Sequence, residues 1–504
     1  MDNIREASSR KHATRYLRRT LRLGDRIRGH RRSNCAHLKS LGGAVSVLAK
    51  KLGSYAGPFS ELHSELEMPS RRAVLLPLAD RLPATRRSGH YAPFRWLHGM
   101  RSAVYGAAGV AIALLAWYPG RWLMILILLP LIWSVTCSRW SAFSLWAAYY
   151  LTGARDIPLA CGRFFTGYGE LSARAALSFG VVFWLGQAVA LAAPWVLLTP
   201  RAGEAPRAVR AALATFFVSL PPLGIIGWLS PLHVASTLYP GWQLAGLLLG
   251  ACMLAAAACV RHSRAAWIGV GLLTGASAVA HLVSQRHEAP FGWVAVDTSL
   301  GRLDQRNYEA LHARLEATKR AAQERFKTGA SVVVLPEEIV GLWRPAMQYW
   351  WRDYIQQLAA SNKMLIFGAD LAEAGSLPGT PISDEPFLRY TDSAVIVGAG
   401  RGRFDSRQPV PAGLWRPWAG VSARPGSVTQ PYLDISGRRA AFSICYEDFL
   451  WWPHWRLLVD RPDVMVSMSN GWFDFDLGLA RIQQQSANSI ARLANVPLLR
   501  AVNR

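Results

Sequence analysis

The most prominent feature of the sequence is a series of apolar runs between residues 103 and 283. Seven runs are separated by short polar segments, at residues 103–118, 122–137, 140–151, 175–198, 211–229, 242–260 and 265–283. The last four reach or approach the roughly 20 residues that a helix needs to cross a bilayer. The first three are shorter and also suit short packed helices. A soluble core with so little charge over this length is not expected, so residues 101–285 predict a transmembrane α-helical bundle of about seven spans.

After about residue 290 the pattern changes to alternating strands and helices. Residues 308–327 predict a helix with Leu311, Leu315, Ala322 and Phe326 on one face, interrupted by Thr318. Residues 481–493 predict a second helix. Short apolar segments predict strands at residues 292–297, 331–335, 364–367, 394–397, 440–444 and 464–467. This order predicts a layered α/β domain over residues 286–504.

Composition agrees with a membrane protein and adds a basic N-terminal leader. Hydrophobic residues make up 51% of the 504 residues and charged residues only 17%, and the formal net charge is +24. Residues 1–100 alone hold 20 Lys and Arg against 7 Asp and Glu, a difference of +13. Such a leader suits a poorly ordered tail, an amphipathic helix on anionic lipid, or a nucleic-acid contact. We expect the poorly ordered tail, so nucleic acid is expected as a partner only through this leader.

The distribution of charge also predicts an orientation. The basic leader favours a cytoplasmic N-terminus, because positive segments next to membrane spans stay on the cytoplasmic side. Seven crossings then place residues 286–504 on the opposite side. We therefore expect a multi-pass protein of a bacterial inner membrane, with its α/β domain in the periplasm.

One cysteine differs from the others in its surroundings. The six cysteines contain no CxxC pair and no regular spacing, so neither a disulfide framework nor a zinc site is predicted. Cys445 directly follows the strand at residues 440–444 and precedes Tyr446, Glu447 and Asp448. A nucleophilic thiol needs a nearby base, and Glu337 supplies one if its strand lies beside that of Cys445. The alternative, from these residues alone, is an inert core cysteine.

Several short motifs then follow one another in a fixed order. They are Pro336-Glu337, Cys445-Tyr446-Glu447, Ser469-Asn470-Gly471-Trp472-Phe473 and the segment 497–503. Together they resemble the nitrilase superfamily of carbon–nitrogen hydrolases, and within it the membrane branch that contains apolipoprotein N-acyltransferase. The Pro-rich segment 220–242 resembles the central span of that enzyme. Residues 407–411 and 483–488 resemble conjugal transfer proteins of Ti-type plasmids.

The resemblance implies a fold and a chemistry. It implies an αββα sandwich above a helical bundle, with Glu337 as general base and Cys445 as the nucleophile that carries an acyl group as a thioester. It places Tyr446 and Glu447 next to the nucleophile, and Asn470 and Trp472 in the binding site. Because the sequence has no phosphate-loop or dinucleotide pattern and no His, Asp or Glu cluster with metal spacing, we expect no cofactor and no metal. The partners that the resemblance implies are membrane lipids, a phospholipid or lipoprotein substrate, and other conjugal transfer proteins.

The sequence departs from the family pattern at three places. Ser406 stands where the family has its oxyanion-stabilising Lys, and Leu414 stands where it has a second Glu. Arg407 is the nearest cation and becomes the candidate for the oxyanion side, although a shift by one residue along a strand points a side chain to the other face. Losing one preorganised oxyanion donor costs about 10²–10³ in rate. The chain also ends soon after residue 503, so we expect a sandwich truncated at its C-terminus.

Three functions remain open from the sequence. The first is a membrane-bound, nitrilase-like protein of plasmid conjugal transfer that acts as a Cys-dependent acyltransferase or amidase. The second is a catalytically impaired membrane scaffold of the same fold. The third is a tether that holds DNA or a transfer complex to the membrane through its basic leader.

Overall fold

The computed structural model describes most of the chain after the leader. It describes residues 92–504 with the exception of 119–121, 137, 169, 201–205, 286, 306 and 374–387, and the side chains from residue 100 onward. The poorly ordered leader predicted for residues 1–100 therefore lies almost wholly outside the described residues, as do Cys35 and Cys137.

The first described part is helical. Its helices are α2 (Ala92–Trp117), α3 (Leu128–Trp133), α4 (Arg139–Gly153), α5 (Ile157–Gly167), α6 (Ala173–Leu197), α7 (Arg207–Ser219), α8 (Val234–Leu238), α9 (Gln243–Ala257) and α10 (Arg264–Val283). Three of them, in α2, α6 and α10, contain segments long and apolar enough to cross a membrane. The apolar segments Leu123–Trp133 and Gln243–Ala257 are shorter. The structure thus gives three candidate spans, and the count of seven is not confirmed.

The apolar run at residues 211–229 is not one helix. Helix α7 ends at Ser219, and Leu220 has extended backbone angles of φ −117° and ψ 151°. Leu220 precedes Pro221, and the proline ring disfavours helical angles at the residue before it. The chain continues through two short 3₁₀ turns, Leu223–Ile226 and Pro231–His233, into α8. Pro221 therefore divides this run. A prediction from apolar residues alone does not reveal the division.

The second part contains two β-sheets. The first holds β1 (Trp293–Ala295), β2 (Val332–Val334), β3 (Met364–Ala372), β4 (Leu388–Gly398), β5 (Gly402–Asp405) and β6 (Val421–Ala423). The second holds β7 (Leu433–Ile435), β8 (Arg438–Ile444), β9 (Val464–Asn470) and β10 (Leu498–Asn503) in the order β10-β9-β8-β7. Strands β1, β2 and β3 are parallel to one another, as are β8, β9 and β10.

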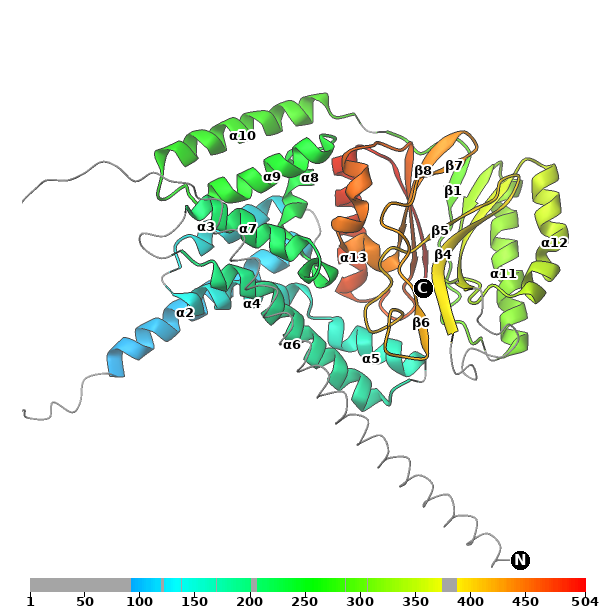
Figure 1. Ribbon diagram of the computed structural model, residues 1–504, viewed down its shortest axis with the longest axis horizontal. Helices are drawn as coiled ribbons and strands as arrows, with labels where there is room; N and C mark the ends of the chain where they lie inside the picture. The colour runs from blue at the N-terminus through cyan, green and yellow to red at the C-terminus, as the bar shows by residue number, and fades with distance from the viewer. Residues whose placement is uncertain are drawn as a thin grey trace, which may run out of the picture. The chain divides into compact units, whose positions relative to one another are not determined.

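The two sheets face each other and carry helices on their outer faces. Apolar side chains of both sheets, including Val334, Ile366, Phe442 and Val466, form one buried core between them. Helices α11 (Tyr308–Lys327) and α12 (Pro345–Ala360) cover the first sheet, and α13 (Gly478–Ala494) covers the second (Figure 1). This arrangement has the αββα layers that the sequence predicted. The other side of α13 packs on the helical part, with which it shares a core.

Helix α11 has the bounds predicted from its periodicity. Its first turn is capped by Asn307, whose side-chain oxygen accepts a hydrogen bond from the Ala310 amide at 3.1 Å. Thr318, the polar interruption of the apolar face, is fully buried, and its hydroxyl donates to the Arg314 carbonyl at 2.8 Å. A threonine that bonds back to its own helix can occupy an apolar face without an unsatisfied hydroxyl group.

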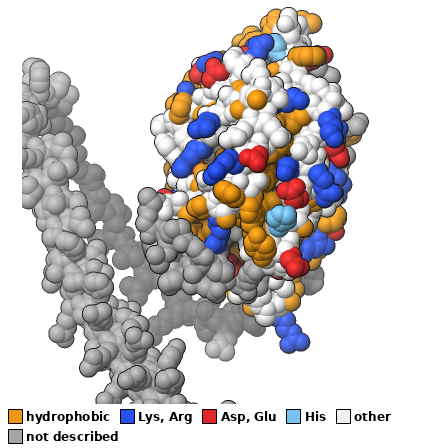
Figure 2. All heavy atoms as spheres, turned by 90° about the vertical axis from the view of Figure 1, so that its right-hand side faces the viewer, with side chains coloured by type: hydrophobic (Ala, Val, Ile, Leu, Met, Phe, Trp, Pro, Cys, Tyr) orange, Lys and Arg blue, Asp and Glu red, His pale blue; other side chains and the backbone are white. Residues whose placement is uncertain are grey.

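The two parts differ in the surfaces that they expose. Figure 2 shows the side formed by α11 and α12, where acidic and basic side chains are interspersed with apolar ones. In contrast, α6 and α10 expose large apolar side chains, namely Leu177, Val181, Val182, Leu185, Val189 and Leu197 on α6, and Trp267, Ile268, Leu272, Val279, Leu282 and Val283 on α10. Exposed apolar faces of this extent are typical of contact with lipid or another protein.

Candidate active site

Glu337 and Cys445 come together across the sandwich. The chain reaches Glu337 three residues after β2, and β8 leads directly into Cys445. The two strands belong to different sheets, so they do not lie side by side, which was the condition for Glu337 to serve as the base. The sheets face each other, however, and the Cys445 thiol lies against the Glu337 carboxyl group. The predicted pair of nucleophile and base is therefore in contact.

The backbone is strained at this meeting point. Cys445 has φ +46° and the neighbour of the base, Glu338, has φ +49°. Residues other than glycine rarely adopt such angles, which cluster at functional sites. Gly368 on β3 is also required here, because a Cβ atom at this position would lie 2.3 Å from the Cα atom of Glu337. The glycine lets β3 pass close to the backbone that carries the base.

Glu337 is held by neighbours that carry no positive charge. Its Oε2 atom accepts a hydrogen bond from the Asn470 backbone amide at 2.7 Å, and the Asp392 carboxyl group lies beside it. Burial raises the pKa of Glu337 well above its ordinary value, and the adjacent Asp392 raises it further. Burial likewise raises the pKa of Asp392 to about 8. The pair therefore retains a proton near neutral pH.

The Cys445 thiol is also protonated in this environment. Burial raises the pKa of Cys445 well above its ordinary value, and the charges of Glu337 and Asp392 raise it further. No Lys or Arg is among the described residues that line the cavity around the sulfur. A thiol in such a site needs a base that removes its proton as the sulfur attacks. Glu337, in contact with the thiol, has the position for this role.

Two further carboxyl groups lie beside this pair. Glu338 accepts hydrogen bonds from the Tyr168 hydroxyl at 2.8 Å and from the Asn470 side-chain amide at 3.1 Å. Asp370 lies opposite Asp392 in the β3–β4 ladder. Burial raises the pKa of Glu338 and, more strongly, that of Asp370. We call the four groups Glu337, Glu338, Asp370 and Asp392 the acidic cluster; Glu338 is half-buried and the other three are buried.

Arg407 is paired with Glu447 and does not lie on the oxyanion side of Cys445, where the sequence suggested it. Its guanidinium group contacts the Glu447 carboxylate at 2.6 Å and donates to the carbonyl oxygens of Pro453 at 2.6 Å and Phe442 at 2.7 Å. The Glu447 carboxylate also accepts the backbone amides of Arg407 and Gln408. Because Arg407 is engaged in this way and does not line the cavity at Cys445, the geometry gives it a positioning role rather than an oxyanion-side one.

The positions that depart from the family pattern contain no substitute cation. The Ser406 side chain is buried and its hydroxyl has no hydrogen-bond partner among the described residues. Leu414 packs in a small apolar cluster with Leu388 and its neighbours. Lys363 bonds the Phe326 carbonyl at 3.1 Å and directly precedes β3. Since β2 and β3 are parallel, Lys363 lies at the opposite end of the sheet from Glu337.

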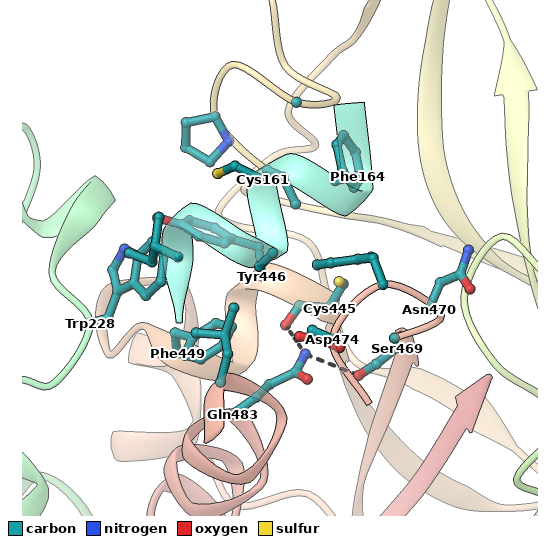
Figure 3. Close-up of a pocket in the computed structure, with 18 of the residues that line it drawn as sticks. Cys161, Phe164, Trp228, Cys445, Tyr446, Phe449, Ser469, Asn470, Asp474 and Gln483 are labelled. Carbon is teal, nitrogen blue, oxygen red and sulfur yellow. Dashed lines mark hydrogen bonds between the residues drawn. The ribbon is translucent and has the colours of Figure 1, made fainter. Parts of the chain in front are cut away.

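An apolar cavity leads from Cys445 to the helical part. It is narrow, about 90 Å³, against roughly 300–1,000 Å³ for ordinary ligand pockets. Its walls include Phe164 and Phe165 of α5, Phe179 and Phe183 of α6, Trp228, Tyr446 and Phe449. Figure 3 shows Cys445 among Phe164, Asn470, Asp474 and Gln483, with Gln483 bonded to the Cys445 carbonyl at 2.9 Å and to Ser469 at 3.1 Å. The sulfur thus lies where the α/β part meets α5 and α6.

Two of the predicted binding residues line this cavity, and a third packs against one of its walls. Tyr446 lines it and donates its hydroxyl to the Ile225 carbonyl at 2.7 Å. Asn470 lines it too, next to Glu337. Trp472 packs parallel to Phe164, with ring centroids 6.4 Å apart. Gly167 of α5 allows this approach, because a Cβ atom there would lie 2.2 Å from the Trp472 ring.

Sequence reasoning missed several residues of the site. Asp392 and Asp370 are acidic residues within apolar strands, a signal that was visible because a buried carboxyl group is costly unless it has partners. Phe164 lies on α5 and Tyr168 directly follows it, between two apolar runs, and no local pattern connects them with Cys445. They reach the site only because α5 packs against the Trp472 segment.

Comparison with curated proteins adds a named relative. The chain is similar to conjugal transfer protein TraB. The TraB of Agrobacterium fabrum strain C58 is 29% identical over 434 residues, which cover 81% of this chain and 93% of the relative. A probable TraB of Sinorhizobium fredii is 28% identical over 383 residues, covering 74% and 90%. The resemblance to conjugal transfer proteins that the sequence predicted is confirmed. No family model matches the chain.

Solved structures that resemble the chain carry nitrilase-superfamily names. An amidase of that superfamily from Nesterenkonia is 14% identical and covers 43% of this chain and 79% of its own, with a TM-score of 0.29. A carbon–nitrogen hydrolase from Helicobacter pylori G27 is 13% identical and covers 42% and 72%, with a TM-score of 0.31.

Proposed function

We propose that the chain is a membrane-bound, nitrilase-like protein of conjugal transfer that transfers an acyl group through a thioester on Cys445. The observation that carries the proposal is the contact between the Cys445 thiol and the Glu337 carboxyl group at the end of an apolar cavity. The named relatives support the conjugal-transfer role, because they align over most of this chain and of their own length.

The cavity favours an acyl donor that arrives from a membrane. Phe179 and Phe183 line the cavity from α6, while Val181, Val182 and Leu185 of the same helix are exposed. Since α6 is one of the candidate spans, the cavity lies directly behind a surface suited to lipid. Its present volume holds the reacting carbonyl group and the start of a chain, so side chains of α5 or α6 must move to admit a longer one.

The reaction follows from the positions of the two groups. With the proton that the pair retains on Asp392, the ionised Glu337 carboxylate takes the thiol proton as the Cys445 sulfur attacks the ester carbonyl carbon of the donor. The carbon–oxygen bond then breaks, and the leaving alcohol receives the proton from Glu337. An amine acceptor attacks the thioester in the second half, releasing the thiol and passing its own proton through Glu337. Water as acceptor makes the same site a hydrolase. Asn470 and the backbone around Gly368 keep the base in place.

The membrane arrangement is part of the proposal. Three candidate spans and exposed apolar faces on α6 and α10 support association with a membrane. With the basic leader in the cytoplasm and an odd number of crossings, the α/β part lies in the periplasm next to an inner membrane. Other conjugal transfer proteins are the expected partners.

A second candidate is a scaffold of the same fold without catalysis. The observation that favours it is the absence of a cation from the described residues that line the cavity at Cys445. An oxyanion that forms there lacks the charge that ordinarily stabilises it, so any turnover is expected to be slow.

Intact-protein mass spectrometry of the membrane-purified full chain distinguishes the two. The acyltransferase predicts an added acyl mass that hydroxylamine removes and that Cys445→Ala lacks. Cys252→Ala, which removes an exposed thiol on α9, is the matched control and should keep the mass. Wild-type protein that carries no such mass and does not react with an acyl-directed thiol trap would support the scaffold.

A further inference from the structure

A second cavity lies beside α13, away from Cys445. It has a volume of about 1020 Å³ and opens between α13, the end of α10 and the region of α2 and α8. Figure 1 shows α13 between the second sheet and the helical part. Gln483 of α13 faces the Cys445 cavity, whereas Arg481, Gln484, Asn488 and Arg492 face the second one. We call this second space the α13 cavity.

The α13 cavity is lined by positive and neutral polar groups. Its wall on α13 is a stripe of exposed residues at a spacing of three or four, namely Arg481, Gln484, Asn488 and Arg492. The opposite wall adds His281 and His287, and Asn495 lies at the end of α13. No Asp or Glu is among the described residues that line it. Such a wall attracts an anion.

The two arginines of this stripe have no carboxylate partner among the described residues, unlike arginines such as Arg439 and Arg416. Arg439 is paired with Asp460 at 2.9 Å, and Arg416 with Glu170 at 2.6 Å. Arg481 and Arg492, in contrast, have no carboxylate partner within the described part of the chain. Arg481 lies over the Tyr118 ring, 6.0 Å from its centroid. Their guanidinium groups therefore remain available for a phosphate, which arginine binds through two parallel hydrogen bonds.

The position of the cavity indicates where the anion comes from. His281 lies in the last turn of α10, and Ser284, Gln285 and His287 directly follow this helix. Helix α10 is a candidate span, and Leu272, Leu282 and Val283 are exposed on it. A lipid whose tails lie along α10 would place its headgroup at the end of the span. This is the depth at which the cavity opens.

We propose that the α13 cavity binds the phosphate headgroup of an anionic lipid. The proposal shares the membrane location with the proposed function, but it requires no chemistry at Cys445. Arg481 and Arg492 bind the phosphate, the amides of Gln484 and Asn488 bind the rest of the headgroup, and the exposed face of α10 contacts the tails. The lipid would link α10 to α13, and through Gln483 on the other side of α13 to the nucleophile segment.

The test measures lipid-dependent stabilisation of the purified full chain in detergent. We expect phosphatidylglycerol to raise the thermal midpoint above that obtained with phosphatidylcholine. The double variant Arg481→Gln/Arg492→Gln should lose most of this difference, with an apparent affinity about tenfold lower or more, since each basic side chain at a membrane surface adds to the attraction. Arg320→Gln/Arg352→Gln is the matched control, because it removes two exposed arginines from α11 and α12.

Further variants and soluble phosphate compounds distinguish the possible outcomes. If Arg481→Gln/Arg492→Gln does not fold, Gln484→Glu/Asn488→Asp places negative charge on the same exposed stripe and should also abolish the lipid response. Equal responses of the wild type and the cavity variants would overturn the proposal. An equal shift with inorganic phosphate or glycerol phosphate would assign the site to a free anion and overturn the lipid. Cys445→Ala should respond like the wild type, so failure of the proposed catalysis leaves this test intact.

Discussion

The carboxyl groups near Cys445 differ in the partners that they have. Glu447 is fully buried and bonded to the Arg407 guanidinium group and to backbone amides. Three members of the acidic cluster are also buried and Glu338 is half-buried, but the groups that donate hydrogen bonds to Glu337 and Glu338 are neutral ones of Tyr168 and Asn470. Accordingly, burial raises the pKa of Glu337, Glu338, Asp370 and Asp392. The comparison separates a carboxylate that holds the structure from carboxyl groups that are available for proton transfer.

The largest effect is expected when the base of the acidic cluster is removed. Glu337→Gln keeps the shape and the bond from Asn470 but cannot accept the thiol proton, so acylation of Cys445 should slow by about 10²–10⁴-fold. The free energy of unfolding should not fall, because a buried, poorly compensated carboxyl group becomes neutral. The measurement is the rate of hydroxylamine-sensitive acylation, followed by intact mass, with Glu309→Gln on α11 as control. An unchanged rate would remove Glu337 from the mechanism.

A loss of stability, in contrast, is expected when Arg407, the cation that pairs with Glu447, is removed. Arg407→Met leaves Glu447 buried without its cation, which should cost about 3–5 kcal/mol of unfolding free energy. Arg403→Met is the matched control, since its pair with Asp405 at 2.8 Å has an arginine that is 55% exposed, and exposed pairs contribute under about 1 kcal/mol. Denaturant unfolding in detergent measures both. Equal losses would contradict the idea that Arg407 has a structural role distinct from that of surface arginines.

The sequence predicts the features that depend on neighbouring residues, but not those that depend on contacts between residues far apart in the chain. Helix α11 and the strand before Cys445 follow from local periodicity, and Cys445 and Glu337 follow from their places after strands. The partner of Arg407 does not, because Glu447 is 40 residues away and only the packing of β8 against the Ser406 segment joins them. The same holds for Asp392, which faces Glu337 from another strand. Pro221 indicates that residues 211–229 do not form one helix, but the apolar content of the run alone predicts a single helix.

Titration of Asp392 offers a way to sharpen the comparison. Its pKa is raised from 3.8 to about 8 in the folded chain, so the folded state holds a proton that the unfolded state releases. Stability from this group is therefore complete below about pH 4 and is lost as the pH rises through about 8. Asp392→Asn should remove that loss, and its advantage over the wild type should grow by on the order of 2 kcal/mol between pH 6 and pH 9.

The measurement for Asp392→Asn is the thermal midpoint as a function of pH. Asp405→Asn, on the neighbouring strand β5, is the comparison variant, because Asp405 has an arginine partner at 2.8 Å. A parallel pH dependence in the wild type and Asp392→Asn would show that Asp392 is ionised throughout, and the acidic cluster would then have a cation that the described residues do not include.

The smallest expected effect concerns a neutral donor of the acidic cluster. Tyr168 follows α5 and donates to Glu338 at 2.8 Å, so Tyr168→Phe removes one hydrogen bond to a half-buried acceptor and should cost about 1 kcal/mol. Tyr308→Phe, at a tyrosine that is 64% exposed, should cost nothing measurable. Because the donor is neutral, the loss should be several times smaller than that of Arg407→Met. A loss as large as that of Arg407→Met would mean that Glu338 is as strongly bound as Glu447, and the distinction between the two groups of carboxylates would fail.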